Sequence, residues 1–248
     1  MKHLHLLPGL FLAIAACSDS GTGGENNNNN NNNPGDCAPV PLLQGDVRLE
    51  EGCYLADQGI DLNDGDALTI APGTVIFFGP GTRFDINGGS VNAEGTAEKP
   101  IILTAVQETR GQWTGVSWRN SDFVDNVWRY VSVEYAGQTP DGAAVDIFED
   151  SGAVRLNARN CTIRESGAYG LSVRSRAATT QLDWSEGSIV DNAKAARLAA
   201  SALEGLQPPN SWDGNDESFI ATGGLVEQDT AWAAHEIPFL IEDDLELD

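Results

Sequence analysis

The chain has 248 residues, of which 37 are acidic and 14 are Lys or Arg, so its formal net charge at pH 7 is −23. Nucleic-acid binding needs clustered Lys and Arg to neutralise phosphates, and this composition excludes nucleic acid as a partner. Hydrophobic residues make up 41% of the sequence and include six Trp, which is enough for the core of one folded domain.

The first residues have the pattern of a secretory signal peptide. Lys2 gives the start a positive charge, and an apolar run from Leu6 to Ala16 follows it. This run is too short to cross a bilayer as a helix of the mature protein. Residues 1–16 are therefore predicted to be a cleaved leader.

The leader ends in Ile14-Ala-Ala-Cys17, and these residues resemble the lipobox of bacterial lipoprotein precursors. The resemblance implies cleavage before Cys17, with diacylglycerol on its sulfur and a further acyl chain, such as palmitate, on its amine. Several acyl chains anchor a protein far more firmly than one myristoyl chain does, so the lipid bilayer is the expected partner of Cys17. Ser18 stands where Asp would indicate inner-membrane retention, which favours the outer membrane. The alternative is an ordinary secretory leader with an unmodified Cys17.

Residues 17–36 have the composition of a flexible tether. They contain Gly-Thr-Gly-Gly at 21–24, eight consecutive Asn at 26–33 and then Pro34-Gly35. Such a segment buries too little apolar surface to offset the entropy lost on ordering. We expect a spacer between the membrane and the domain, and a role of the Asn run in aggregation is the alternative.

Three cysteines remain after Cys17. In an oxidising compartment, Cys37 and Cys53 are candidates for a disulfide that pins the start of the domain, and Cys161 lies in an alternating segment typical of a buried core residue. The sequence has no C-x-x-C pair, and His235 is the one histidine after the leader. We therefore expect no metal site and no cofactor, and we expect His235 to be exposed.

From residue 46 onwards, short apolar segments alternate with turn residues. Leu68–Ile70, Val75–Phe78 and Phe84–Ile86 are separated by Pro-Gly or Gly-Pro-Gly, and helical periodicity is absent there. Apolar residues recur at intervals of 23 to 26 residues, in the pairs Ile60/Phe84, Leu68/Val91, Val75/Ile101, Leu156/Leu182 and Ile163/Ile189. Periods of this length without a helix in each repeat predict stacked β coils.

These segments resemble the right-handed parallel β-helix proteins of bacterial envelopes, on residues 67–78, 91–96, 100–104, 113–118, 131–135, 161–171 and 188–192. The resemblance covers residues 46–248 and implies an all-β, right-handed parallel β-helix within a domain that spans residues 37–248. It implies little about chemistry, because one fold carries many functions.

The end of the chain has two distinctive segments. The Ala, Leu and Arg content of residues 193–206 predicts a last coil that runs into a short helix or loop. Residues 54–63 align without gaps with residues 239–248, so the latter are interpreted as a terminal strand pair that caps the solenoid, or as the sign of a shortened relative of a longer array. Residues 213–248 hold eleven carboxylates and no Lys or Arg, which suits an exposed acidic cap.

Enzymatic activity is the alternative to a binding role. The β-helix proteins that the chain resembles include two classes of enzyme that act on polysaccharides. Lyases use carboxylates with an Arg or Lys base, and hydrolases use clustered Asp with a Gly-His-Gly turn. The chain has no His between His5 and His235, so the hydrolase signature is missing. Asp146 and Arg155 are the candidates for lyase chemistry, although exposed carboxylates are expected anywhere on so acidic a protein.

Two further patterns point to binding. Asp61-Leu-Asn-Asp-Gly-Asp66 looks like part of a Ca²⁺ loop, but it lacks the full spacing and the final Glu, so a turn before the next strand explains it better. An aromatic platform for sugar rings, with packing under a loop as the alternative, is predicted from four tryptophans, Trp113, Trp118, Trp128 and Trp184.

The sequence is therefore interpreted as an envelope-anchored β-helix lipoprotein with a binding or structural role, in contact with a surface glycan, matrix or envelope protein. No catalytic residue is assigned. The alternative is a polysaccharide lyase or glycoside hydrolase that uses the groove of the β-helix.

Overall fold

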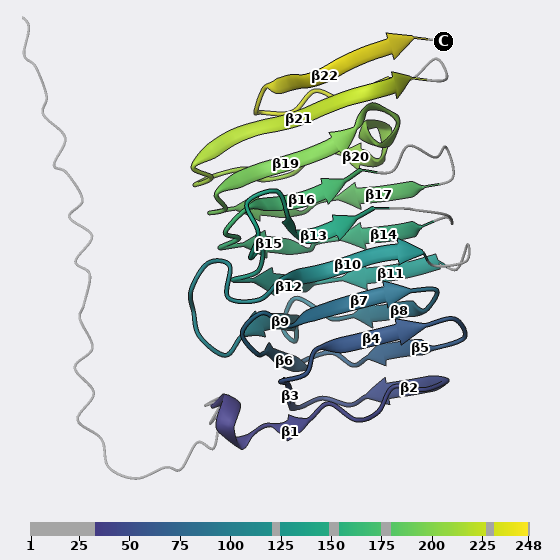
Figure 1. The fold of residues 1–248 in the computed structure, drawn as a ribbon, viewed down its shortest axis with the longest axis vertical. Helices are drawn as coiled ribbons and strands as arrows, with labels where there is room; N and C mark the ends of the chain where they lie inside the picture. The colour runs from purple at the N-terminus through teal and green to yellow at the C-terminus, as the bar shows by residue number, and fades with distance from the viewer. Residues whose placement is uncertain (1–32, 121–124, 149–153, 175–179, 227–230, 248) are drawn as a thin grey trace, which may run out of the picture. The chain divides into compact units, whose positions relative to one another are not determined.

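The computed structural model describes residues 33–120, 125–148, 154–174, 180–226 and 231–247. The predicted leader, the lipidation residue Cys17 and nearly all of the predicted tether lie outside the described residues. The described chain folds into a right-handed parallel β-helix, as the recurrence of short apolar segments predicts (Figure 1).

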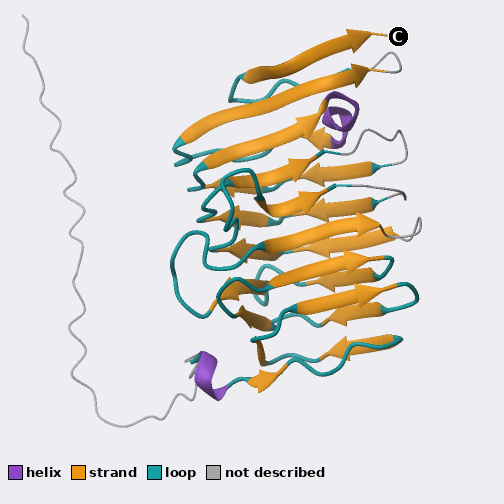
Figure 2. Ribbon diagram, viewed as in Figure 1, coloured by secondary structure: helices purple, strands orange, loops and turns teal. Residues whose placement is uncertain are grey.

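Three parallel sheets run along the axis of the β-helix (Figure 2). Sheet A has seven strands, β1 (Ala38–Pro39), β3 (Cys53–Ala56), β6 (Val75–Phe78), β9 (Ile101–Ala105), β12 (Val131–Glu134), β15 (Thr162–Arg164) and β18 (Ser188–Val190). Sheet B also has seven, β2 (Asp46–Leu49), β5 (Ala67–Ile70), β8 (Ser90–Glu94), β11 (Asp125–Arg129), β14 (Arg155–Arg159), β17 (Gln181–Ser185) and β20 (Leu206–Gln207). Sheet C has eight, β4 (Ile60–Asn63), β7 (Arg83–Asn87), β10 (Gly115–Asn120), β13 (Ala143–Ile147), β16 (Tyr169–Val173), β19 (Lys194–Ala199), β21 (Glu217–Val226) and β22 (Phe239–Leu247). Two short 3-10 helices, η1 (Pro34–Asp36) and η2 (Ala200–Gly205), complete the described elements.

The register between coils follows the predicted apolar repeat at four of its five pairs, Ile60/Phe84, Leu68/Val91, Leu156/Leu182 and Ile163/Ile189. The fifth prediction is wrong, because Val75 pairs with Ile102 instead of Ile101. Alternation along the strands explains the difference. A pairing with Ile101 would set the fully buried Ile76 beside the half-buried Ile102, whereas the observed register pairs Ile76 with the buried Leu103.

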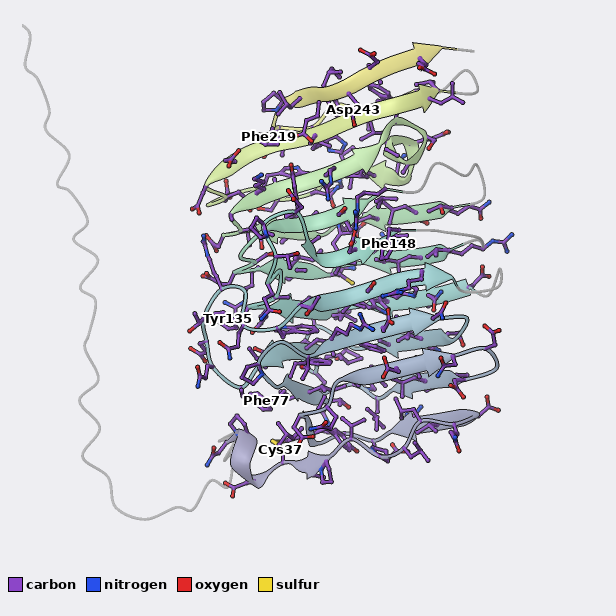
Figure 3. All side chains as sticks on the ribbon, in the orientation of Figure 1. Cys37, Phe77, Tyr135, Phe148, Phe219 and Asp243 are labelled. Atoms are coloured by element: carbon purple, nitrogen blue, oxygen red, sulfur yellow. A yellow bond between two sulfur atoms is a disulfide. The ribbon has the colours of Figure 1, made fainter. Side chains whose placement is uncertain are left out.

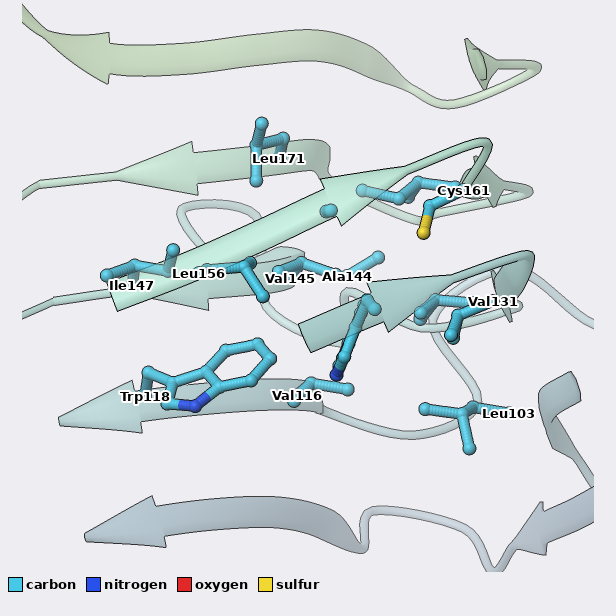
Figure 4. Packing of buried hydrophobic residues seen from close by; sticks show 14 of the residues in the cluster. Leu103, Val116, Trp118, Val131, Ala144, Val145, Ile147, Leu156, Cys161 and Leu171 are labelled. Carbon is cyan, nitrogen blue, oxygen red and sulfur yellow. The ribbon is translucent and has the colours of Figure 1, made fainter. Parts of the chain in front are cut away.

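The core is the interior of the coils. Alternate side chains of every sheet point inward, so apolar residues from successive coils stack in continuous columns (Figure 4). One such column in sheet A contains Ile76, Leu103, Val133, Ile163 and Ile189. Each coil buries its interior against its neighbours, which is why the repeat must be stacked to be stable.

The N-terminal end of the β-helix begins with a short strand that a disulfide holds in place. Cys37 and Cys53 form the predicted disulfide, which links the segment before β1 to β3. The strand β1 has two residues and includes Pro39, which has no backbone N–H to donate. Cys161, in contrast, is buried as expected, and burial raises the pKa of its thiol to about 11.

The C-terminal end differs from the sequence prediction. Strand β19 does run into a short 3-10 helix, η2, but it is not the last coil, because β20 and β21 follow it. The predicted terminal strand pair is wrong, because residues Phe239–Leu247 form one strand, β22, parallel to β21. A strand pair would need a turn within residues 239–247, and the register with β21 continues to Leu247 after one irregularity.

His235 is half-buried, contrary to the expected exposure. The centroid of its imidazole lies 5.6 Å from the ring centroid of the buried Trp212 and 6.0 Å from that of Phe239. Burial lowers the pKa of His235, and a hydrogen bond with the backbone of Leu206 opposes part of this shift. The folded chain therefore favours the neutral imidazole.

A pH dependence of stability follows from the lowered pKa of His235. The contribution of the neutral ring is present above the ordinary His pKa of about 6.5 and is lost as the pH falls through the lowered folded value, because the unfolded chain binds the proton first. We expect the melting temperature of the wild type to fall more steeply below about pH 6.5 than that of His235→Phe, which keeps an aromatic ring without a titrating group. Thermal denaturation of both proteins across this range checks it, and parallel curves would contradict it.

Candidate functional site

The four predicted glycan-contacting tryptophans do not form a surface platform. Trp113, Trp118, Trp128 and Trp184 are all fully buried in the core. The ring of Trp113 stacks on Phe78 at a centroid distance of 4.0 Å, and its Nε1 donates to the carbonyl of Glu134 at 2.8 Å. The glycan-platform prediction is therefore wrong. Burial of a large indole stabilises the coil interior, and the interior is where alternation places these side chains.

The predicted lyase candidates lie on different sheets. Asp146 belongs to β13 of sheet C and receives two hydrogen bonds from Arg174, at 3.3 and 2.5 Å. Arg155 belongs to β14 of sheet B and lies 3.6 Å from the carboxylate of Asp125. The two strands belong to different sheets of the β-helix. The structure therefore pairs each of them with a different residue and does not bring the two together.

Asp61–Asn63 belong to strand β4, and the predicted turn before the next strand lies at Asp64–Gly65. The carboxylate of Asp66 accepts hydrogen bonds from the backbone N–H of Gly45 at 2.8 Å and of Asn63 at 2.9 Å. These two hydrogen bonds lower the pKa of Asp66, that with Asn63 most. Among the described residues, no group of three or more His, Cys, Asp or Glu side chains is arranged to hold a metal ion.

Polar side chains on the outer face of sheet C lie above one another, because the pairing of successive strands aligns them. Its outward positions alternate with buried residues such as Phe84, Val145 and Leu171. Pairing from coil to coil produces one outward column, Asp61, Asp85, Ser117, Asp146, Ser172 and Arg197. Sheet C therefore carries an ordered outward column of polar side chains, in which Asp85 and Ser172 are buried under their neighbours.

Guanidinium groups and one aromatic ring form a stack on this face. The Cζ atoms of Arg119 and Arg174 lie 5.5 and 5.0 Å from the ring centroid of Phe148, the residue after β13 (Figure 3). The two arginines are also held by carboxylates, since Arg119 lies 3.2 Å from Asp85 and Arg174 pairs with Asp146. Stacking on the ring and pairing with a carboxylate fix the direction of each arginine side chain.

Tyr169 lies at the C-terminal side of the same face. Lys194 and Arg197 approach its ring at 4.9 and 4.7 Å, and its hydroxyl donates to Oε1 of Glu242 at 3.3 Å. Burial, together with the negative charge of Glu242, raises the pKa of Tyr169 to about 12. Tyr169 therefore stays protonated and connects β16 to β22 across the two strands between them.

A cleft of about 690 Å³ opens where sheet C ends. Its charged lining consists of Arg174 and Arg197 from the β16 and β19 region and of Glu242, Asp243, Asp244 and Glu246 from β22. Within the described residues, neither Arg197 nor any of these four carboxylates has an ion-pair partner within 4.0 Å. Arg197 donates instead to the backbone carbonyl of Asp141 at 2.8 Å, and Glu242 accepts from Tyr169, so no ion pair among the described residues of the cleft neutralises these charges.

The acidic side of the cleft depends on an irregular pairing of β21 and β22. Thr222 pairs with Ile241, and the next paired residues are Gly224 and Leu245, so three residues of β22 lie opposite Gly223. A Cβ at residue 223 would lie 2.7 Å from the Cβ of Asp243, which a side chain does not tolerate. Glycine at this position therefore permits the arrangement that gathers the carboxylates.

The chain was compared with protein-family models, curated proteins and solved structures. No family model, no curated protein and no solved structure matches it. The fold itself defines a right-handed parallel β-helix protein. In the part of the chain that the structure describes, no helix has the length and apolar character needed to span a membrane.

Proposed function

We propose that the chain is a lipoprotein of the right-handed parallel β-helix type that is anchored in the bacterial outer membrane through Cys17 and binds a glycan in the sheet C cleft. The signal peptide, the lipobox and the Asn-rich segment support the anchoring. The repeat architecture supports a binding role, because stacked coils present long continuous surfaces.

The observation that carries the binding proposal is the composition of the cleft. Sugar hydroxyls donate to carboxylates and accept from guanidinium groups, so a polyhydroxylated ligand can satisfy both kinds of group at once. The guanidinium of Arg197 offers donors beyond the one that binds Asp141, and Glu242 and Asp244 offer carboxylate acceptors in the same cleft. The stacked Arg174, held by Asp146 and Phe148, provides a rigid edge.

Retention on immobilised polysaccharides tests this function. The full chain, purified in detergent, is passed over neutral, acidic and amino-sugar polymers. We expect saturable retention on at least one of them, and a weakening of about tenfold for Arg197→Ala and for Glu242→Gln, since each removes hydrogen bonds to a charged group. Arg48→Ala is the matched control, because Arg48 is exposed on β2 of sheet B.

The same incubation separates binding from catalysis. Release of new reducing or unsaturated ends would establish the alternative, a hydrolase or lyase, in place of a binding protein. Absence of retention on every polymer, or equal retention of Arg197→Ala and the wild type, would overturn the glycan proposal.

A further inference from the structure

The edge strands at the two ends of the β-helix differ in length and in protection against pairing with another chain. At the N-terminal end, the edge strand of sheet A is β1, which has two residues, contains Pro39 and is tied down by the Cys37–Cys53 disulfide. Short strands and proline are the usual protection against pairing with another chain. At the C-terminal end, the edge strand of sheet C is β22, with nine residues and no proline. Only one edge of β22 is paired within the described residues, and its partner there is β21.

Apolar side chains are left uncovered at this end. Of the five large hydrophobic residues that are exposed in the described chain, four lie on the last two strands, namely Leu225, Leu240, Ile241 and Leu245. Ile241 pairs with the buried Thr222, so it continues an inward-facing column that includes Leu198 and Val173. It is 49% exposed because no described strand covers that level of the coil. A further strand laid along β22 would bury it.

The negative charge of β22 determines which kind of strand can pair with its free edge. Glu242, Asp243, Asp244 and Glu246 lie within five residues of each other, and none has an ion-pair partner in the described chain. A second copy of β22 would place like charges opposite one another, which is destabilising. A strand with Lys or Arg at alternate positions would neutralise these carboxylates while its other side chains cover the apolar row.

We propose that the free edge of β22 docks an extended basic segment of another protein as a ninth strand of sheet C. The backbone N–H and C=O groups of β22 form the new ladder, its carboxylates pair with the basic side chains, and Ile241 and Leu245 pack against the apolar ones. This docking uses the strand edge and the backbone. It shares the carboxylates of Glu242 and Asp244 with the proposed glycan cleft, whereas Arg174 and Arg197 serve the glycan alone.

Three peptides test the docking of a basic strand. Each is as long as β22, nine residues. The first alternates Lys and Val, the second alternates Glu and Val, and the third is the Lys and Val peptide with its alternate backbone nitrogens methylated on one edge. Fluorescence anisotropy of labelled peptide is measured against the full chain in nonionic detergent. We expect saturable binding of the first peptide and a loss of about tenfold or more for the other two, because one reverses the charge and one blocks the ladder.

Variants of the protein separate strand addition from charge attraction alone. Asp244→Lys is expected to weaken the Lys and Val peptide about tenfold, whereas Glu236→Lys, an exposed acidic position just before β22, is the matched control and should change binding little. Leu240→Ser removes an exposed apolar side chain and should also weaken binding. Equal binding of the methylated and unmethylated peptides would overturn the proposal. Self-association of the protein through β22, lost in Asp244→Lys, would overturn it in favour of a second copy as the occupant.

Discussion

Replacement of Cys17 with Ser is expected to move the protein from the membrane fraction to the soluble fraction. In the proposed anchor, the sulfur of Cys17 carries the diacylglycerol, and burial of acyl chains contributes about 0.8 kcal/mol per CH₂. Serine has no thiol for this thioether, so nothing replaces the anchor. Fractionation of cells followed by immunoblotting measures the effect.

The controls for the anchor use the neighbouring residue. Ser18→Ala keeps the thiol and should leave the protein in the outer membrane, whereas Ser18→Asp should shift it to the inner membrane if the sorting rule of enteric bacteria applies. Retention of Cys17→Ser in the membrane fraction would refute lipidation. It would leave the β-helix unaffected, because Cys17 precedes the described domain.

Truncation of Trp113 is expected to have the largest effect on stability. Its ring is fully buried, stacks on Phe78 at 4.0 Å and donates to the carbonyl of Glu134. Trp113→Ala removes this packing and leaves both a cavity and an unpaired carbonyl, so the free energy of unfolding should fall by about 3–5 kcal/mol. Urea denaturation followed by circular dichroism measures it.

Two comparisons make the Trp113 result specific. Trp113→Phe keeps much of the ring and should lose clearly less stability than Trp113→Ala. Trp232→Ala, which truncates a half-buried indole near the C-terminal end, should also cost less. If Trp113→Ala lost glycan binding while its stability stayed unchanged, the ring would be a surface contact after all, and its place in the core would be wrong.

The sequence predicted the architecture well because the architecture depends on repetition. Alternation along each strand and a recurrence of 23 to 26 residues are sufficient to set Ile60 beside Phe84 and Leu156 beside Leu182. The same alternation also indicates that the tryptophans face inward. Trp118 follows Val116 by two residues and so shares its inward face, while Ser117 and Arg119 point outward.

The residues that line the candidate cleft were not predicted. Arg174 follows Phe148 by 26 residues, so the repeat alone would have set the two side by side on sheet C. The carboxylates of β22 could not be placed in this way. They reach the cleft through the irregular pairing opposite Gly223, and a periodic pattern carries no information about a local interruption of the period.

The disulfide at the N-terminal end of the stack makes the two ends of the β-helix differ in how easily they unfold. Since each coil is supported by its neighbours alone, loss of structure in such a stack spreads from whichever terminus opens first. The Cys37–Cys53 cross-link closes the start of the first coil, whereas β22 is held by β21. Unravelling should therefore begin at β22 and travel towards the disulfide-linked N-terminal end, and a strand docked on β22 would delay its first step.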